Sequence, residues 1–175
     1  MVNPRGLGIA AGLMAFAVGA CGGDDFGAAA SQAQVDSLCD AICDNSVACD
    51  DPPPVRSECI DSCQAGISPE MLAAGAIDQL VECVGDLACT DDDQACVDAL
   101  PEQDYVADVI AACTAYNARC EGEEDCADPD FQTNLRLFSE AYLNAINACY
   151  TDAACPTVDG SPLDDCTAAV GDDFS

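Results

Sequence analysis

The amino-acid sequence predicts an all-α fold, a small disulfide-rich helical bundle built from two related modules. Apolar residues recur at the i, i+3, i+4 spacing of amphipathic helices through most of the chain, and segments that alternate like strands are scarce. Fifteen cysteines lie in 175 residues, a density typical of exported proteins held together by disulfides. A seven-residue cysteine motif occurs in both halves of the chain, which indicates an internal repeat.

The first twenty residues have the layout of a secretion signal. Arg5 precedes an apolar, uncharged run over residues 7–18. A run of about a dozen residues is too short to span a bilayer, which needs roughly 20. We therefore expect this segment to direct export.

The run ends in Val18-Gly19-Ala20-Cys21, which resembles the lipobox of bacterial lipoproteins. In that family a diacylglyceryl group is added to the cysteine thiol, and a dedicated peptidase cuts directly before it. The resemblance implies that residues 1–20 are a signal peptide, that Cys21 carries the lipid and that residues 21–32 are a flexible tether. Gly22 stands where enteric lipoproteins retained in the inner membrane have aspartate, so the resemblance favours the outer membrane.

An ordinary signal peptide is the alternative, because Val18 and Ala20 also suit the general signal peptidase. The number of cysteines favours lipidation. With Cys21 set aside, fourteen remain, an even number that disulfides can use completely. Each buried CH₂ contributes about 0.8 kcal/mol, and a single acyl chain binds a membrane only marginally. The two or three chains of a lipoprotein cysteine would hold the protein at the cell envelope.

The chain is strongly acidic, with 33 aspartates and glutamates against four arginines and with no lysine or histidine. Removal of the signal leaves three arginines and a formal net charge of −30. Such a surface repels nucleic acid and anionic headgroups, and it attracts cations or basic partners. An adaptation for solubility, for example in a saline habitat, is the favoured explanation of the charge over any specific ligand.

Helix signals divide the first half of the chain. Ser31 and Gln34 form a capping box before an amphipathic segment, which the prolines at 52–54 end. A short helix follows and stops near Gly66.

Two further helices are predicted before the second half begins. Ser68-Pro69 combines a capping hydroxyl with a first-turn proline and predicts the start of a helix that runs through Val84. Thr90-x-x-Asp93 predicts the start of another short helix, which ends before Pro101.

The second half repeats this plan. Apolar residues over 106–116 line a helix that ends around Cys120. After an acidic loop, Asp128-Pro129 predicts the start of the longest helix, in which apolar residues are spaced by four and three up to Cys149. Ser161-Pro162 opens a last short helix that ends at Gly171.

The repeated motif is C-x-x-D-x-A-C, and it occurs at residues 83–89 and 149–155. Each copy ends a long helix and precedes a short one with a further cysteine. Residues 43–49 are a looser third copy. The sequence therefore predicts two modules, over residues 33–100 and 101–171, which hold eight and six cysteines.

Fourteen cysteines are predicted to form disulfides: Cys39, Cys43, Cys49, Cys59, Cys63, Cys83, Cys89, Cys96, Cys113, Cys120, Cys126, Cys149, Cys155 and Cys166. Six residues of helix turn the second cysteine of a C-x5-C motif by about 240° from the first. The two are therefore expected to bond to different neighbours. The complete pairing stays open.

Two C-x3-C pairs occur, Cys39 with Cys43 and Cys59 with Cys63. Residues four apart are neighbours on one helical face. Two such helices placed antiparallel would be joined by two rungs, such as Cys39–Cys63 and Cys43–Cys59. The spacing is similar to the twin C-x3-C hairpins of small mitochondrial intermembrane-space proteins. The similarity covers about 25 residues and is one of geometry, because Cys49 in the connecting segment departs from that pattern.

The sequence contains no recognisable catalytic motif. The lack of histidine excludes Ser-His-Asp and Cys-His catalysis and His-ligated metals, and the lack of lysine excludes a Schiff base or a P-loop. No C-x-x-C redox pair occurs, and two C-x3-C pairs suit a Cys₄ metal site less well than disulfides in an oxidising compartment. We expect no cofactor, no metal centre, no small-molecule substrate and no enzymatic activity.

The many carboxylates could supply the oxygen ligands that calcium prefers. Asp91–Asp93 suit the N-terminal end of the helix that follows them. Asp125-x-x-Asp128-x-Asp130 and Asp159-Gly160 have loop-like spacing, but no complete EF-hand pattern occurs. Solvated acid is the favoured interpretation, with binding of divalent cations as the alternative.

Residues 21–171 also resemble the uncharacterised cysteine-rich lipoproteins of myxobacteria and related Gram-negative bacteria, a resemblance that implies no particular activity. The leading hypothesis is a lipid-anchored, non-catalytic protein of the cell envelope with a structural or protein-contact role. A surface calcium- or cation-binding module is the first alternative. The second is a disulfide-rich inhibitor or effector, which would diffuse and therefore lack the acyl anchor.

Overall fold

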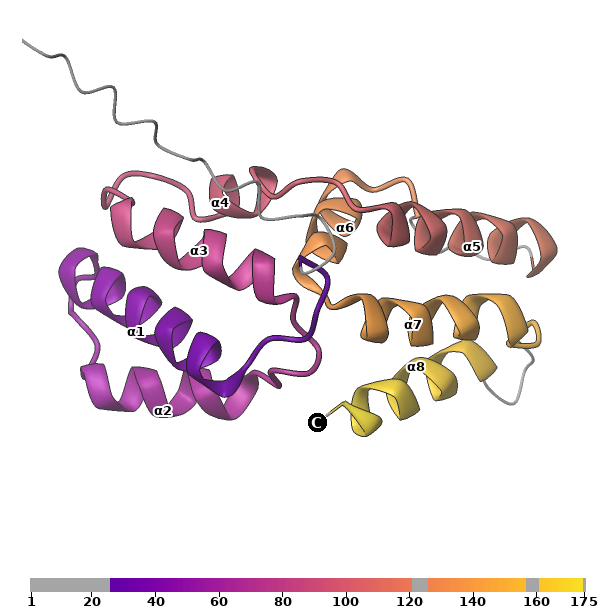
Figure 1. The fold of residues 1–175 in the computed structure, drawn as a ribbon, viewed down its shortest axis with the longest axis horizontal. Coiled ribbons are helices and arrows are strands. Elements are labelled where there is room, and N and C mark those ends of the chain that lie inside the picture. The colour runs from indigo at the N-terminus through magenta and orange to yellow at the C-terminus, as the bar shows by residue number, and fades with distance from the viewer. Residues whose placement is uncertain (1–25, 121–125, 157–160, 175) are drawn as a thin grey trace, which may run out of the picture.

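The structure is a computed structural model that describes residues 26–120, 126–156 and 161–174. In these ranges the chain folds into helices and forms isolated β-bridges but no β-strand. The helices gather in two groups along the long axis, α1–α4 in one and α5, α7 and α8 in the other, with α6 between them (Figure 1). This architecture confirms the predicted all-α, disulfide-rich fold.

The elements in chain order are α1 (Gln32–Cys49), α2 (Arg56–Gly66), α3 (Ala74–Asp86), α4 (Gln94–Asp98), α5 (Asp104–Cys120), α6 (Pro129–Asn134), the 3₁₀ turn η1 (Leu135–Leu137), α7 (Glu140–Asp152) and α8 (Pro162–Asp173).

The first half is built on α1 and α3, which run parallel. Near their N-terminal ends Gln34 Nε2 donates to Asp78 Oδ1 at 2.9 Å, and near their C-terminal ends Asn45 Nδ2 donates to Leu87 O at 3.1 Å. Their facing apolar side chains form one core, whose buried members are Ala30, Leu38, Ala73, Ala76, Ile77, Leu80, Val84, Cys96, Leu100.

Helix α2 lies antiparallel to α1 and has no buried residue. Little apolar area therefore holds it in place, because hydrophobic stabilisation is proportional to the apolar surface removed from water. Two disulfides join it to α1 instead. The position of α2 thus depends on covalent bonds more than on packing.

The second half repeats the parallel arrangement with α5 and α7, and α8 packs against α7 (Figure 1). Tyr116 of α5 and Tyr150 of α7 meet edge to face, with ring centroids 6.0 Å apart. The core of this half is separate from the first, and its buried members are Val106, Val109, Cys113, Tyr116, Cys126, Leu135, Leu143, Cys149, Tyr150, Leu163.

Three non-helical segments, residues 26–31, 69–73 and 138–139, meet between the two halves. The middle segment forms an isolated bridge with each of the other two. Ser139 is fully buried there, and its hydroxyl donates to Glu70 O at 2.8 Å. Backbone hydrogen bonds thus tie the N-terminal segment and both halves together.

The segment before α1 differs from the flexible tether expected over residues 21–32. The carbonyls of Phe26 and Gly27 accept hydrogen bonds from the first residues of α3 and α7, at 3.1 and 2.8 Å. The expectation therefore does not hold for the last seven residues, which are packed or helical. The first five lie outside the described residues.

The helix predicted from Ser68-Pro69 begins later, at Ala74. Met71 N donates to Ser68 O at 3.2 Å, and Leu72 N donates to Pro69 O at 3.3 Å, as in a turn. The backbone is then extended and bonds across the junction. The helix does not begin at Ser68 because backbone groups of residues 71–73 form hydrogen bonds across the junction instead.

The longest predicted helix, from Asp128-Pro129 to Cys149, is interrupted. After η1 the backbone is extended at Phe138, and Ser139 caps α7 by accepting a hydrogen bond from Tyr142 N at 3.3 Å. The apolar spacing continues through the break because both sides of it face buried positions. Periodicity alone therefore did not reveal the interruption.

The other helix starts agree with the sequence more closely. The Ser31 capping box is present, and the Ser161 hydroxyl accepts from Asp164 N at 3.3 Å. Helix α4 begins directly after Asp93, about one turn beyond the predicted Thr90 start.

Candidate functional site

The fourteen cysteines that follow Cys21 form seven disulfides. The pairs are Cys39–Cys63, Cys43–Cys59, Cys49–Cys89, Cys83–Cys96, Cys113–Cys126, Cys120–Cys155 and Cys149–Cys166. Such a set belongs to an oxidising compartment outside the cytosol, where disulfides form and persist. Cys21 itself lies outside the described residues.

Three disulfides of the first half have counterparts in the second. Cys49–Cys89 corresponds to Cys120–Cys155, with Cα–Cα distances of 4.9 and 5.0 Å. Cys43–Cys59 corresponds to Cys113–Cys126, with distances of 5.8 and 5.9 Å. Cys83–Cys96 corresponds to Cys149–Cys166, and both distances are 5.7 Å. Cys39–Cys63 has no counterpart. Each C-x5-C motif bonds to two different partners, as its helical geometry predicted.

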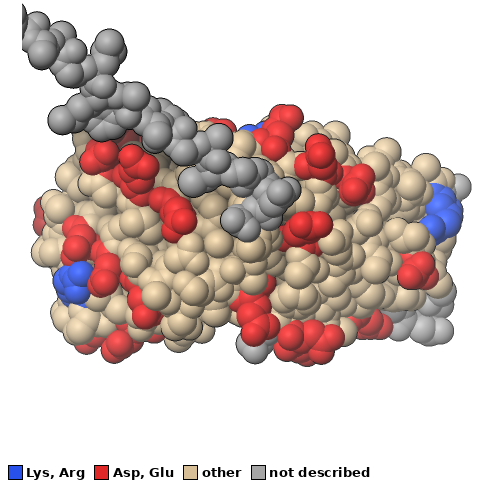
Figure 2. Space-filling view, viewed as in Figure 1, with Lys and Arg blue, Asp and Glu red and all other residues tan. Residues whose placement is uncertain are grey.

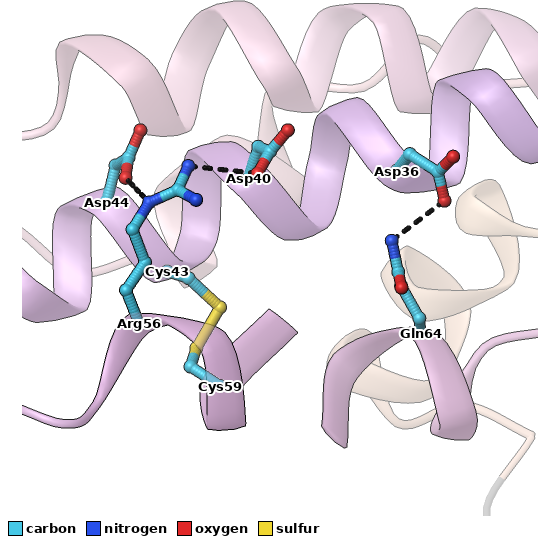
Figure 3. Close-up of polar contacts among 7 residues, drawn as sticks. All are labelled: Asp36, Asp40, Cys43, Asp44, Arg56, Cys59 and Gln64. Carbon is cyan, nitrogen blue, oxygen red and sulfur yellow. Dashed lines mark hydrogen bonds and ion pairs between the residues drawn. A yellow bond between two sulfur atoms is a disulfide. The ribbon is translucent and has the colours of Figure 1, made fainter. Parts of the chain in front are cut away.

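The two rungs between α1 and α2 are those suggested by the C-x3-C spacing, Cys39–Cys63 and Cys43–Cys59 (the latter drawn in Figure 3). Polar contacts flank them. Arg56 of α2 bonds to Asp44 and Asp40, which are four residues apart on α1 (Figure 3). The hydrogen bond from Arg56 is the main cause that lowers the pKa of the Asp44 carboxyl.

An apolar groove lies between α1 and α3. It consists of two adjoining hollows of about 250 and 240 Å³ that share Leu38, Leu80 and Leu137, the last from η1. Further apolar lining comes, in the first hollow, from Ile42, Val84, Leu87, Val97 and, in the second, from Ile67, Met71, Leu72, Ile77, Phe138. The groove is partly open to solvent and suits apolar side chains of another molecule.

A third hollow, of about 460 Å³, adjoins the groove at the C-terminal ends of α1 and α3. It shares Asn45, Ser46, Leu87 and Asp93 with the groove. Its remaining acidic lining residues are Asp50, Asp91, Asp92. In the described part of the chain no arginine forms an ion pair with these four carboxylates. One end of the groove is therefore strongly negative.

The corresponding end of the second half is occupied by Arg119. Its guanidinium donates to the carbonyls of Tyr150, Thr151 and Ala153 at 3.2, 3.1 and 2.9 Å, and it lies over the Tyr116 ring at 5.5 Å from the centroid. The last carbonyls of a helix carry partial negative charge, which a cation stabilises. Arg119 thus closes the C-terminal end of α7.

The equivalent of Arg119 in the first half is Ala48. Each of the two directly precedes the cysteine that ends its helix, and each carbonyl contacts the Sγ of the bridged cysteine, at 3.7 and 3.9 Å respectively. The neutral amide of Asn45 donates to Leu87 O in place of a guanidinium. The first half therefore lacks the cation that the second half supplies from its own chain.

The surface carries acid over both halves, and basic side chains show only as small patches (Figure 2). The three arginines in the described ranges all bond within the chain. Arg56 contacts α1, Arg119 contacts the end of α7, and Arg136 donates to Leu100 O at 2.8 Å and pairs with Glu102. A basic partner would therefore meet carboxylates without competition from free arginines.

Among the described residues no cluster of three or more histidine, cysteine or acidic side chains is arranged to hold a metal ion. Asp92 Oδ1 accepts from Gln94 N at 3.0 Å, and Asp128 caps α6 by accepting from Asp130 N at 2.7 Å. Asp125 and Asp159 lie outside the described residues. Calcium binding stays a prediction.

Comparisons with known proteins found no counterpart: no protein family, no curated protein and no solved structure matches the chain. A search of the described helices for a membrane span found none that is long and apolar enough.

Sequence reasoning identified the cysteines and missed the groove and Arg119. The apolar face of α1 was visible in the sequence, but nothing local showed that α2 and α3 leave part of it uncovered. Arg119 was recognisable only by aligning the residue before Cys49 with the residue before Cys120, since the role of each depends on the helix across from it.

Proposed function

We propose that the protein is a lipid-anchored, non-catalytic domain of the bacterial cell envelope that acts through contact with another protein. The observation that carries the proposal is the complete pairing of the fourteen cysteines after Cys21. The fifteenth cysteine, Cys21, lies outside the described residues, and the lipobox sequence before it supports lipidation of its thiol.

The position of the first packed residue also bears on the proposal. Phe26 lies five residues after Cys21, and an extended chain covers at most about 3.6 Å per residue. The tether would therefore reach no further than about 18 Å. A lipid on Cys21 would hold the domain close to the membrane surface.

The test is the intact mass of the protein extracted from membranes, measured before and after reduction. We expect the mass of two or three acyl chains on residues 21–175 and an increase of fourteen hydrogens on reduction, two for each of seven disulfides. A mature protein that starts at Cys21 without acyl mass, or one that is cleaved elsewhere, would contradict the lipid anchor. Free thiols in the unreduced sample would contradict the structural role of the cysteines.

A further inference from the structure

We infer that the groove between α1 and α3 binds an amphipathic helix of a basic partner protein, whose apolar face fills the groove and whose arginine or lysine lies at the acidic end. This inference rests on the protein-contact part of the proposed function and names the site and the chemistry of the partner. It does not depend on the lipid.

The shape and lining of the groove suit the apolar face of a helix. Leu38 and Leu80 form a floor that the two hollows share, and Ile42, Val97 and Leu137 along it are partly buried. Grooves of this kind take the apolar residues of a helix at positions i, i+3 or i+4, and i+7. The groove lies on helices held by disulfides, so it is preformed.

The negative charge at one end of the groove suits a basic residue of the partner. The hollow at the end of the groove has four aspartates in its lining, and the C-terminal ends of α1 and α3 both point to it. The partial negative charge of two helix ends adds to that of the carboxylates. A positively charged side chain beside apolar residues matches this surface, because complementary charge speeds encounter and fixes register.

The second half of the same chain already has an arginine at the equivalent helix end. Arg119 bonds to three carbonyls at the end of α7, whereas the first half has alanine at the equivalent position and a hollow at the end of α3, which Leu87 and Ala88 help to line. An arginine of the partner would supply at the end of α3 the positive charge that Arg119 supplies at the end of α7, beside the neutral Asn45 amide that donates to Leu87 O.

Other occupants fit the observations less well. A second copy of the chain would bring a charge of −30 and, in the described residues, only arginines that already bond within the chain. Repulsion between like charges opposes such a dimer. An acyl chain would fill the apolar hollows but would leave the acidic end without a cation.

The test uses the full chain with Cys21→Ser, exported so that its disulfides form. The probe is a fluorescein-labelled 18-residue peptide of leucine, alanine and arginine with leucines at i, i+3, i+4, i+7 and two arginines at one end. The control is a peptide of the same composition with the leucines in scrambled order. At 150 mM salt we expect fluorescence anisotropy to show at least about tenfold tighter binding of the amphipathic peptide.

Two variants with matched controls test the site itself. Ala48→Arg provides an internal cation at the acidic end and should weaken binding by about tenfold, whereas Ala118→Arg, next to Arg119, should leave it unchanged. Ile42→Asn in the groove should weaken binding by a similar factor. Val47→Asn, on the same helix but outside the groove, should not. Circular dichroism verifies that each variant is folded.

Equal binding of the amphipathic and scrambled peptides would overturn the inference, since it would show attraction to net charge alone. Unchanged binding to folded Ala48→Arg and Ile42→Asn would overturn the assignment of the site. Dimerisation that Ile42→Asn abolishes, or binding of a fluorescent fatty acid in preference to the peptide, would assign the groove to another occupant. None of these results depends on acylation, which the intact mass reports separately.

Discussion

The two halves of the molecule share one covalent frame and differ in how its outer end is closed. In both, a pair of parallel helices is bridged at its C-terminal ends, and the equivalent Cα–Cα distances agree within 0.1 Å. In the second half Arg119 neutralises that end. In the first half the end is open, acidic and continuous with an apolar groove.

The difference teaches that equivalent disulfides build the same scaffold twice, and that the residue before the bridged cysteine, Arg119 or Ala48, distinguishes the two ends. The first half also carries α2, which two disulfides hold against α1 and which buries no residue of its own. Substitutions at the disulfides and at the proposed binding site should therefore have separable effects. The expected effects of substitutions follow from that separation.

The largest effect is expected from the bridges at the outer ends. Replacement of Cys49 and Cys89, or of Cys120 and Cys155, by alanine opens segments of 40 and 35 residues. Loop-closure entropy gives a cost of about 4 kcal/mol for either loop. Urea unfolding should show similar losses for the two variants. A loss in one half more than twice that in the other would contradict the equivalence of the two frames.

A smaller effect is expected from the bridge that the second half lacks. With Cys43–Cys59 intact, removal of Cys39–Cys63 frees only the short segment between the rungs, so replacing both cysteines by alanine should cost about 2–3 kcal/mol. Hydrogen exchange should speed up in α2 while the α1–α3 core stays protected. Equal exchange in α2 before and after the change would mean that packing, not the rung, holds the helix.

The next effect is expected at Arg119. Arg119→Ala removes the guanidinium from three carbonyls and from the Tyr116 ring, at a cost of roughly 1–2 kcal/mol because the site is exposed. Arg119→Lys should recover part of the loss. The converse change, Ala48→Arg, should raise the stability of the first half. A thermal midpoint that Arg119→Ala leaves unaltered would show that the cation has no structural role.

The smallest effect is expected at the exposed pair of Arg56 and Asp44. Arg56 lowers the pKa of the Asp44 carboxyl below its usual value of about 3.8, so the pair stabilises the folded state above that pH. The contribution is lost as the pH falls through the lowered pKa. The difference in stability between wild type and Arg56→Gln should therefore be present at neutral pH, shrink below about pH 4 and weaken with salt. A difference that persists at pH 2 would contradict the ion pair as its cause.

The sequence contained most of the fold, because cysteine spacing and helical periodicity are local signals. The two rungs from α1 to α2 followed from residues four apart, and the Ser31 and Ser161 caps marked real helix starts. The break at Phe138 and the late start of α3 were not predictable in this way. Both arise where segments distant in sequence exchange backbone hydrogen bonds around Ser139.

The groove was hidden for the same reason. Ile42 and Val84 belong to segments in which the sequence predicts helices, and only the packing of the helices and η1 shows that part of their apolar surface stays uncovered. The contrast between Arg119 and Ala48 needed the paired cysteines to align the two halves. The proposed binding site therefore depends on tertiary differences between two similar frames.

Disulfide mapping of the unreduced protein tests the shared frame most directly. Cleavage before aspartate together with cleavage after arginine places at least one cut between every two successive cysteines of the fourteen. Mass spectrometry should then find Cys49 linked to Cys89 and Cys120 linked to Cys155, alongside the other five pairs. Links within the motifs, Cys83 to Cys89 or Cys149 to Cys155, would contradict the two equivalent frames on which the account depends.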